Sequence, residues 1–421
     1  MPIKSLKGLF AALAGITMLS LGGCSTPCEL PGRSCAPVES YSAVPPPARA
    51  VDRPRADAVL PPPAARPEPA APMQTMPVEP PDAAPAAKRA VRIGLMLPLR
   101  SAALGTPADA LRAGFMAAWE RDRAGFTVNL IDTGDSPQET LDAYVGALRQ
   151  NDIVVGPLAR SAVTALATSA LVTKPTIALN HPEATARAVT LPAQMLVIGL
   201  SIEDEARQVA KWAASEHPGG AALIVSGASA WQRRIANSFA AQWKQLGYKS
   251  QTIVLADSNG YLNEAALGQL RTQITTTPPT FVFTALDPSQ AGQVRGAVGA
   301  DLPAYGTSSV NPGPDASIAE LDGMRLLDMP WQVQPSHQAV MVYPRWLGTT
   351  RTLDMDRLYA LGIDAFRVAR EIAQRPGADF VLDGVTGRLS VSFGRGQARF
   401  ERVQPAAVYQ GGGYTLVPDG R

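Results

Sequence analysis

Polar side chains gather in loops that follow several short apolar runs, where a ligand or a partner could be bound. Together with one tight Gly-Pro turn, they are Arg100, Ser101, Asp135, Gly156, Pro157, Asn180, His181 and Glu183. In wound α/β sheets, ligands meet the loops at the carboxyl ends of the strands. We therefore expect these residues to line the mouth of a cleft, where their charged and hydrogen-bonding groups would orient what binds there.

The sequence lacks the motifs that would make such a cleft catalytic. It contains no phosphate-binding glycine loop, no G-x-S-x-G elbow and no S-x-x-K nucleophile, and residues 91–421 contain no cysteine. The only histidines, His181, His217 and His337, are far apart in the sequence and do not form a zinc set. The acidic run 203–205 fits the first turn of a helix, where the helix dipole favours carboxylates. We expect a protein that is not an enzyme and holds no metal or cofactor.

Apolar strands that alternate with amphipathic helices must position these loops. Strands are predicted at 91–97, 126–131, 153–155, 176–179 and 195–200, with helices at 107–121 and 160–171 and another that begins at the cap Ser136. Apolar strands that alternate with helices argue for a parallel sheet covered on both faces.

A second series of the same kind begins at Ser201, which has capping-box spacing to Asp204. It comprises strands at 221–225, 251–255, 280–285 and 324–328 and helices at 230–246, 288–298 and 356–373. Shorter alternating runs at 389–393, 398–402 and 408–410, separated by Gly-rich turns, predict an antiparallel meander.

The fold class is therefore α/β, with two lobes that are each a parallel sheet wound with helices. We expect lobe 1 to comprise residues 91–200 plus 322–376, and lobe 2 to comprise residues 201–321 plus 377–421.

Residues 1–23 are predicted to be a lipoprotein signal peptide. Lys4 and Lys7 precede an apolar run over 9–21 that is too short to span a bilayer. The run ends in Leu-Gly-Gly-Cys, which resembles the bacterial lipobox and implies diacylglycerol on the Cys24 thiol, cleavage before Cys24 and acylation, as with palmitate, of the new amino terminus. Ser25 follows instead of aspartate, which in bacteria of the enteric type implies anchoring in outer-membrane lipid with the body in the periplasm.

Residues 24–90 are predicted to form a lipidated, Pro/Ala-rich linker, with 17 prolines and 15 alanines between residues 25 and 90. Proline lacks an amide donor and fixes φ, so we expect neither helix nor sheet interior here. Extended at about 3.1 Å per residue, this tether would reach on the order of 200 Å. Cys28 and Cys35 lie in it, where they could pair with each other or stay free.

Composition limits the partners. The 421 residues include 38 basic and 36 acidic side chains, so the formal charge of +2 gives no electrostatic case for binding nucleic acid. The length of 421 residues predicts two or three folded units, and with 46% hydrophobic residues most of the chain can bury a core. The sequence contains no run of about 20 apolar residues, so it predicts no transmembrane helix.

Several segments resemble known families. Residues 93–99 and 113–118 resemble the opening of type I periplasmic-binding-protein folds. The succession 153–158, 178–183 and 203–206 more specifically resembles the penicillin-binding protein activator (LpoA-like) family of outer-membrane lipoproteins, and 358–365 and 387–390 fit as well. The likeness spans nearly all of residues 91–421.

This resemblance implies a two-lobed type I periplasmic-binding-protein fold after a disordered tether. It also implies a non-catalytic lipoprotein that binds and activates a class A penicillin-binding protein, a peptidoglycan synthase, in cell-wall synthesis. Long members of the family carry a helical-repeat domain where this chain has its linker. We expect the linker to supply the reach that stacked helices supply in those members.

Two other functions compete with this interpretation. A lipid-anchored solute-binding protein of an ABC transporter would share the fold and bind an amino acid or similar small ligand in the interlobe cleft. Asp135 and the pair Arg160-Ser161 could serve such a ligand. A peptidoglycan hydrolase is disfavoured because no nucleophile, metal set or pair of catalytic carboxylates is evident.

Overall fold

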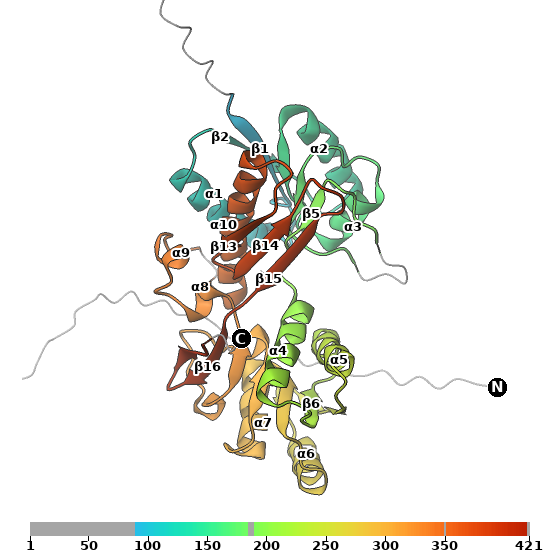
Figure 1. Ribbon diagram of the computed structural model, residues 1–421, viewed down its shortest axis with the longest axis vertical. Coiled ribbons are helices and arrows are strands. Elements are labelled where there is room, and N and C mark those ends of the chain that lie inside the picture. The colour runs from blue at the N-terminus through green and yellow to red at the C-terminus, as the bar shows by residue number, and fades with distance from the viewer. Residues whose placement is uncertain (1–88, 184–188, 349–350, 419–421) are drawn as a thin grey trace, which may run out of the picture. The chain divides into compact units, whose positions relative to one another are not determined.

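Strands form where the chain has short apolar runs, and helices form where apolar residues recur every three or four positions. The computed structural model describes residues 89–183, 189–348 and 351–418, all within one compact unit (Figure 1). The predicted signal peptide, the lipidation of Cys24 and nearly all of the linker lie outside these ranges. Within them, no helix is long and apolar enough to cross a membrane.

The first lobe is built on a parallel sheet with the strand order β2-β1-β3-β4-β5. Its strands are β1 (Val91–Leu97), β2 (Phe126–Asp132), β3 (Ile153–Val155), β4 (Thr176–Ala178) and β5 (Met195–Val197). Every residue of β3, β4 and β5 is buried, as expected for a sheet covered on both faces.

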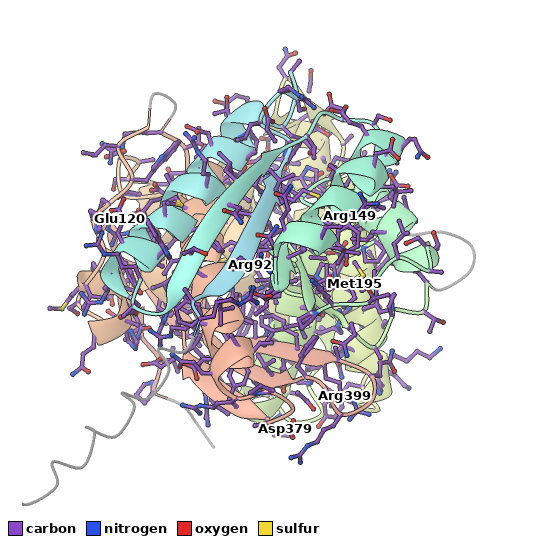
Figure 2. The ribbon with its side chains drawn as sticks, turned by 90° about the horizontal axis from the view of Figure 1, so that it is seen from above. Arg92, Glu120, Arg149, Met195, Asp379 and Arg399 are labelled. Atoms are coloured by element: carbon purple, nitrogen blue, oxygen red, sulfur yellow. The ribbon has the colours of Figure 1, made fainter. Side chains whose placement is uncertain are left out.

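Two pairs of helices cover this sheet. α1 (Gly105–Arg121) and α10 (Leu353–Gln374) pack on one face, and α2 (Pro137–Gln150) and α3 (Arg160–Thr168) pack on the other. Figure 2 shows this arrangement from above, with Glu120 on α1 and Arg149 on α2 at opposite sides of the sheet. Two short helices that precede α10, α8 (Pro330–Val333) and α9 (Gln338–Met341), also belong to the first lobe, where Trp331 and Val340 enter its core.

The second lobe is built on a mixed sheet with the order β17-β16-β12-β11-β10-β6-β7. Its parallel strands are β6 (Ala222–Ser226), β7 (Ser250–Val254), β10 (Phe281–Ala285), β11 (Ala304–Gly306) and β12 (Arg325–Leu327). Two antiparallel strands, β16 (Ala406–Gln410) and β17 (Gly413–Leu416), complete one edge.

Helices again cover both faces of this sheet. α4 (Ile202–Glu216) and α5 (Ala230–Gln245) share one core, and α6 (Glu264–Thr276) and α7 (Pro288–Val298) share the other. Short elements complete the lobe: the hairpin of β8 (Asp257–Ser258) and β9 (Tyr261–Leu262), and the 3₁₀ turns η1 (Ser308–Val310) and η2 (Ala319–Leu321). The predicted α/β fold of two lobes, each a parallel sheet wound with helices, is confirmed, with the antiparallel β16 and β17 added at one edge of the second sheet.

Helix starts follow the capping residues of the sequence. The Ser136 hydroxyl accepts from the backbone N–H of Glu139 at 3.5 Å, and the Ser201 hydroxyl accepts from that of Asp204 at 3.1 Å. Both caps agree with the sequence prediction, because serine at this position satisfies an amide that has no partner within the helix.

The predicted carboxyl-terminal meander is wrong in one respect. β13 (Phe380–Asp383), β14 (Arg388–Ser392) and β15 (Arg399–Val403) form a three-stranded antiparallel sheet, but β16 leaves it and pairs with β12. The chain departs at Gln404-Pro405, where proline cannot donate a ladder hydrogen bond.

The predicted lobe boundaries are also wrong, because the strands pair and pack in the lobe opposite to the one predicted. The sequence pattern assigns residues 322–376 to lobe 1 and 377–421 to lobe 2, but β12 pairs with β11 of the second lobe. Conversely, Phe380, Leu389 and Val391 pack into the core of the first lobe. The chain therefore crosses between lobes near residues 198–201, at 328–329 and at 404–405.

Candidate functional site: the joint between the lobes

Arg100 and Ser101, predicted to line the cleft, instead bond to residues close to their own loop. The guanidinium of Arg100 forms an ion pair with Glu139, and its Nε lies 3.9 Å from Asp132. The buried Ser101 hydroxyl accepts from the backbone N–H of Leu104 at 2.8 Å, just before α1. Asp135 is exposed. These contacts shape the ends of β1 and β2.

Gly156 and Asn180 also have structural roles. Gly156 has φ of 122°, and a Cβ at this position would lie 2.1 Å from the carbonyl oxygen of Met96 on β1. A cis peptide bond joins Gly156 to Pro157. Asn180 Nδ2 donates to the carbonyl of Leu158 at 3.1 Å, while its Oδ1 accepts from the backbone N–H of His181 at 2.9 Å. These groups hold neighbouring loops together.

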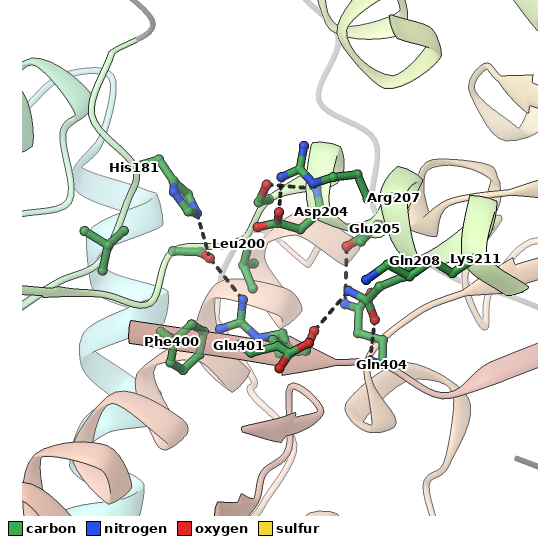
Figure 3. A pocket seen from close by; sticks show the side chains of 14 residues that line it. His181, Leu200, Asp204, Glu205, Arg207, Gln208, Lys211, Phe400, Glu401 and Gln404 are labelled. Carbon is green, nitrogen blue, oxygen red and sulfur yellow. Dashed lines mark hydrogen bonds and ion pairs between the residues drawn. The ribbon is translucent and has the colours of Figure 1, made fainter. Parts of the chain in front are cut away.

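Of the predicted cleft residues, only His181 lines the interlobe pocket in Figure 3. His181 Nε2 lies 3.3 Å from the carbonyl oxygen of Gly199. Burial, opposed by the Asp204 carboxylate, lowers the pKa of His181. Glu183 is exposed, and its backbone N–H donates to the Thr164 hydroxyl at 2.8 Å.

The interlobe pocket has a volume of about 170 Å³ and lies where two of the crossings meet. Its walls are the loop at His181, residues 197–201, one side of the first turns of α4, and residues 400–404 of β15 and the third crossing. The pocket therefore lies between α4 of the second lobe and β15 of the first (Figure 3).

Glu205 is the buried acid of this joint, only 6% exposed. Its Oε2 accepts from the backbone N–H of Ser308 at 3.0 Å, and its Oε1 accepts from Gln404 Nε2 at 3.2 Å. Burial, reinforced by the Asp328 carboxylate, raises the pKa of Glu205, although Ser308 and Arg357 oppose the shift. The carboxyl group thus connects α4 with η1 and the third crossing.

Arg402 secures the first crossing from the side of β15. Its guanidinium donates to the carbonyl oxygens of Ile198 and Gly199 at 2.7 and 3.0 Å, and its Nε donates to the Thr386 hydroxyl at 3.0 Å. Burial lowers the pKa of Arg402 to about 10, still well above neutrality. Arg402 therefore remains a cation that binds the carbonyl groups of the first crossing to the three-stranded sheet of β13, β14 and β15.

Gln208 and Gln404 join α4 to the third crossing. Gln208 Nε2 donates to the carbonyl oxygen of Arg402 at 3.0 Å, and Gln208 Oε1 accepts from the backbone N–H of Gln404 at 3.1 Å. Gln404 Oε1 is buried and accepts no hydrogen bond from the described residues. Nearly every buried polar group at this joint is thus already bonded to another part of the chain.

This arrangement suits a structural joint better than an active site. Among residues 89–183, 189–348 and 351–418, no group of three or more His, Cys, Asp or Glu side chains could hold a metal ion. Ligand pockets usually enclose about 300–1,000 Å³, more than is present here. A ligand would also have to displace hydrogen bonds that hold the lobes together.

We predict that Glu205→Gln will remove a pH-dependent loss of stability. The raised pKa means that the folded protein binds this proton more tightly than the unfolded chain, so stability falls as the pH rises from the ordinary value of 4.5 towards the folded pKa. Glutamine carries no charge and can still accept from the Ser308 amide. In urea unfolding from about pH 4 to about pH 8, the free energy of unfolding of the variant should rise relative to that of the wild type as the pH rises.

Glu203→Gln is the matched control, because Glu203 lies in the same helical turn but is partly exposed and paired with Arg234. It should show no such gain with pH. Parallel pH profiles for wild type and Glu205→Gln would contradict the assignment.

Sequence reasoning missed Glu205, Gln208, Arg402 and Gln404. It attributed 203–205 as a whole to the helix dipole, yet Glu205 is buried while Asp204 pairs locally with Arg207. One signal was present: Glu205 lies four residues before Val209, on the apolar stripe of α4. The partners on β15 could not be found in this way, because Gln208 and Arg402 are 194 residues apart.

The family model described as "LppC putative lipoprotein" matches residues 83–403. Two proteins named penicillin-binding protein activator LpoA are also similar. The one from Photobacterium profundum is 25% identical over 368 residues, which are 77% of this chain and 56% of that protein. The one from Enterobacter sp. (strain 638) is 29% identical over 314 residues, 64% of this chain and 42% of that protein. The chain thus spans about half the length of these relatives.

Two solved structures share the fold. The C-domain of LpoA from Haemophilus influenzae, described as a regulator of PBP1A, has a TM-score of 0.59 and 22% identity, covering 78% of this chain and all of that one. A protein of Chromobacterium violaceum described as a putative branched-chain amino acid ABC transporter has a TM-score of 0.64 and 35% identity, covering 76% of this chain and all of that one.

The type I periplasmic-binding-protein fold and the resemblance inferred from the sequence are both confirmed by these similarities. Because the family model matches most of the chain, including the first two crossings and the greater part of both lobes, the protein belongs to the LppC lipoprotein family.

Proposed function

We propose that this protein is a non-catalytic, lipid-anchored activator that binds a class A peptidoglycan synthase. The proposal rests on the similarity to two proteins named penicillin-binding protein activator LpoA, together with the match of residues 83–403 to the LppC lipoprotein family. The joint is compatible with it, because its buried groups bond to one another and, within the part of the chain that the structure describes, no group of three or more His, Cys, Asp or Glu side chains could hold a metal ion. The function would then lie on the surface of the body.

The proposed anchor is acylated Cys24 in the outer membrane, followed by the linker 24–90 and the body in the periplasm. The chain enters the body beside β1, where Arg89 and Arg92 both pair with Asp152, at 2.9 and 3.3 Å. In this proposal the linker provides the distance that the body needs to reach a synthase in the inner membrane. Halving the linker should abolish complementation of a deletion strain while the body stays folded, and unchanged complementation would defeat this part.

Binding to a purified class A penicillin-binding protein tests the main proposal. The full chain, purified in detergent, should bind the class A enzyme saturably in a surface-plasmon measurement. A class B penicillin-binding protein, which lacks the glycosyltransferase domain, serves as the matched control and should not bind. Equal binding of both enzymes, or of neither, would contradict the proposal.

A solute-binding protein of an ABC transporter is the second candidate. It is favoured by the 35% identity to the Chromobacterium violaceum protein, whose whole length this chain covers. The joint argues against it, because the pocket encloses about 170 Å³ and is framed by groups such as Glu205 and Arg402 that are bonded within the chain.

We therefore predict that leucine, isoleucine and valine will not stabilise the protein. A ligand at 100 times its Kd would stabilise the folded state by about 2.7 kcal/mol, which is visible in a thermal scan. Scans with millimolar amino acid should give the melting temperature of the protein alone. A reproducible rise with one amino acid, absent with its D-enantiomer, would favour the receptor.

A further inference from the structure

The strand β7 forms an open edge of the second lobe. It pairs in parallel with β6 along its whole length, from Ala222 opposite Ser250 to Ser226 opposite Val254, and no described strand pairs with its other side. Four of its five residues are exposed. Parallel strands are usually covered, and an uncovered edge leaves backbone donors and acceptors free to pair with another chain.

A groove lies beside the amino end of this strand. It has a volume of about 760 Å³, and apolar side chains form part of its lining, among them the buried Ala222 and Leu223 and the half-buried Ala240. Tyr248 forms part of its wall and packs against buried Trp243, with ring centroids 4.8 Å apart. Trp243 Nε1 donates to the Lys249 carbonyl at 3.0 Å, which holds the start of β7 against α5.

The charges of the groove have one sign. Lys244 and Lys249 line it, and no aspartate or glutamate does. Neither lysine forms an ion pair with a described residue. Towards the other end of β7, Val254 is 53% exposed, and the hairpin that follows carries Tyr261, which is 61% exposed. The open edge of β7, the apolar groove beside its amino end and the unpaired charges of Lys244 on α5 and Lys249 just before β7 therefore lie close together.

We propose that β7 and this groove, the β7 dock, bind an extended, acidic segment of a partner protein as an added strand. The segment would pair its backbone with β7, place apolar side chains in the groove and bring carboxylates to Lys244 and Lys249. The groove opens at the amino ends of β6 and β10, whereas Ser308, beyond the carboxyl end of β11, faces Arg357 of the first lobe. The β7 dock thus leaves the joint undisturbed. The identity of the partner as the synthase rests on the proposed function.

Charge reversal and edge blocking test the dock. Lys244→Glu/Lys249→Glu should weaken binding of the class A synthase about tenfold, since two screened pairs become repulsive. Val254→Asp should also weaken binding of the synthase, because the new carboxylate would repel the carboxylates of the acidic segment. Arg123→Glu/Arg149→Glu is the matched control for charge, with both arginines exposed on the first lobe. Val381→Asp is the control for the edge, because Val381 is 55% exposed on β13.

A second probe separates the dock from the identity of the partner. A fluorescent peptide of alternating glutamate and valine should bind the full chain, more weakly at high salt and about tenfold more weakly to Lys244→Glu/Lys249→Glu. A peptide of alternating lysine and valine should not bind. If the wild type binds no synthase, the proposed function fails and the peptide alone decides the dock. The dock is overturned if the acidic peptide does not bind, or if the dock variants bind an active synthase as well as their controls do.

Discussion

Replacing Arg357 with methionine should lower the free energy of unfolding by about 3–5 kcal/mol, because it leaves a buried carboxylate without its counter-ion. Asp328 is fully buried at the second crossing, and its Oδ2 lies 2.8 Å from Arg357 Nη2 on α10. The same Nη2 donates to the Ser308 carbonyl of the second lobe at 2.8 Å. Burial alone would lower the pKa of Arg357, but Asp328 raises it above its ordinary value. Methionine keeps the length of the apolar stem, so the loss would report on charge.

The exposed partner of the same arginine is the matched control. Asp354 lies 3.2 Å from Arg357 Nη1 but is 79% exposed, so Asp354→Ala should cost less than about 1 kcal/mol. The double variant Arg357→Met/Asp328→Asn should recover most of the loss, because it removes the unpaired charge. Urea denaturation measures all three. A loss in the double variant as large as in Arg357→Met would show that packing, and not charge, is responsible.

Gly362→Ala should destabilise the first lobe by about 3 kcal/mol, because α1 and α10 cross with almost no space between their backbones. A Cβ on Gly362 would lie 2.0 Å from the Leu111 carbonyl oxygen, and one on Gly114 would lie 1.9 Å from that of Tyr359. The helices would have to separate, which would disturb the edge-to-face contact of Phe115 with Phe366, whose ring centroids are 5.4 Å apart. Thermal unfolding by circular dichroism measures the effect.

Gly146→Ala makes the same chemical change where there is space. Gly146 lies inside α2, and no heavy atom beyond its immediate helical surroundings is within 4 Å of the added Cβ. Alanine there should stabilise the protein by about 0.5–1 kcal/mol, because glycine is a poor helix former. If both variants shift the melting temperature in the same direction, the argument from helix contact is wrong.

Most of the fold could be predicted because its signals are local. Apolar runs such as 153–155 fall on strands in the structure, and serine caps such as Ser201 mark helix starts. The path of the chain between the lobes could not be predicted in this way. β12 and β16 are about 80 residues apart in sequence, and nothing local to either shows that they pair in one sheet.

The site was less predictable than the fold. The rule that ligands meet the carboxyl ends of strands selected Arg100 and Asn180, whose side chains instead bond to a neighbouring helix and a neighbouring loop. The joint is built from Glu205, Arg402 and Gln404, which are brought together by the crossings. Such residues are set by tertiary pairing across about 200 residues, and one sequence without its structure carries no record of it.

The proposed activation of a class A synthase is tested most directly by the rate of glycan polymerisation. A purified class A penicillin-binding protein would be assayed with lipid-linked substrate, with and without the full chain, and a monofunctional glycosyltransferase would serve as the control. We expect a faster, saturable rate for the class A enzyme and no change for the control. An unchanged class A rate with folded protein present in excess would contradict it.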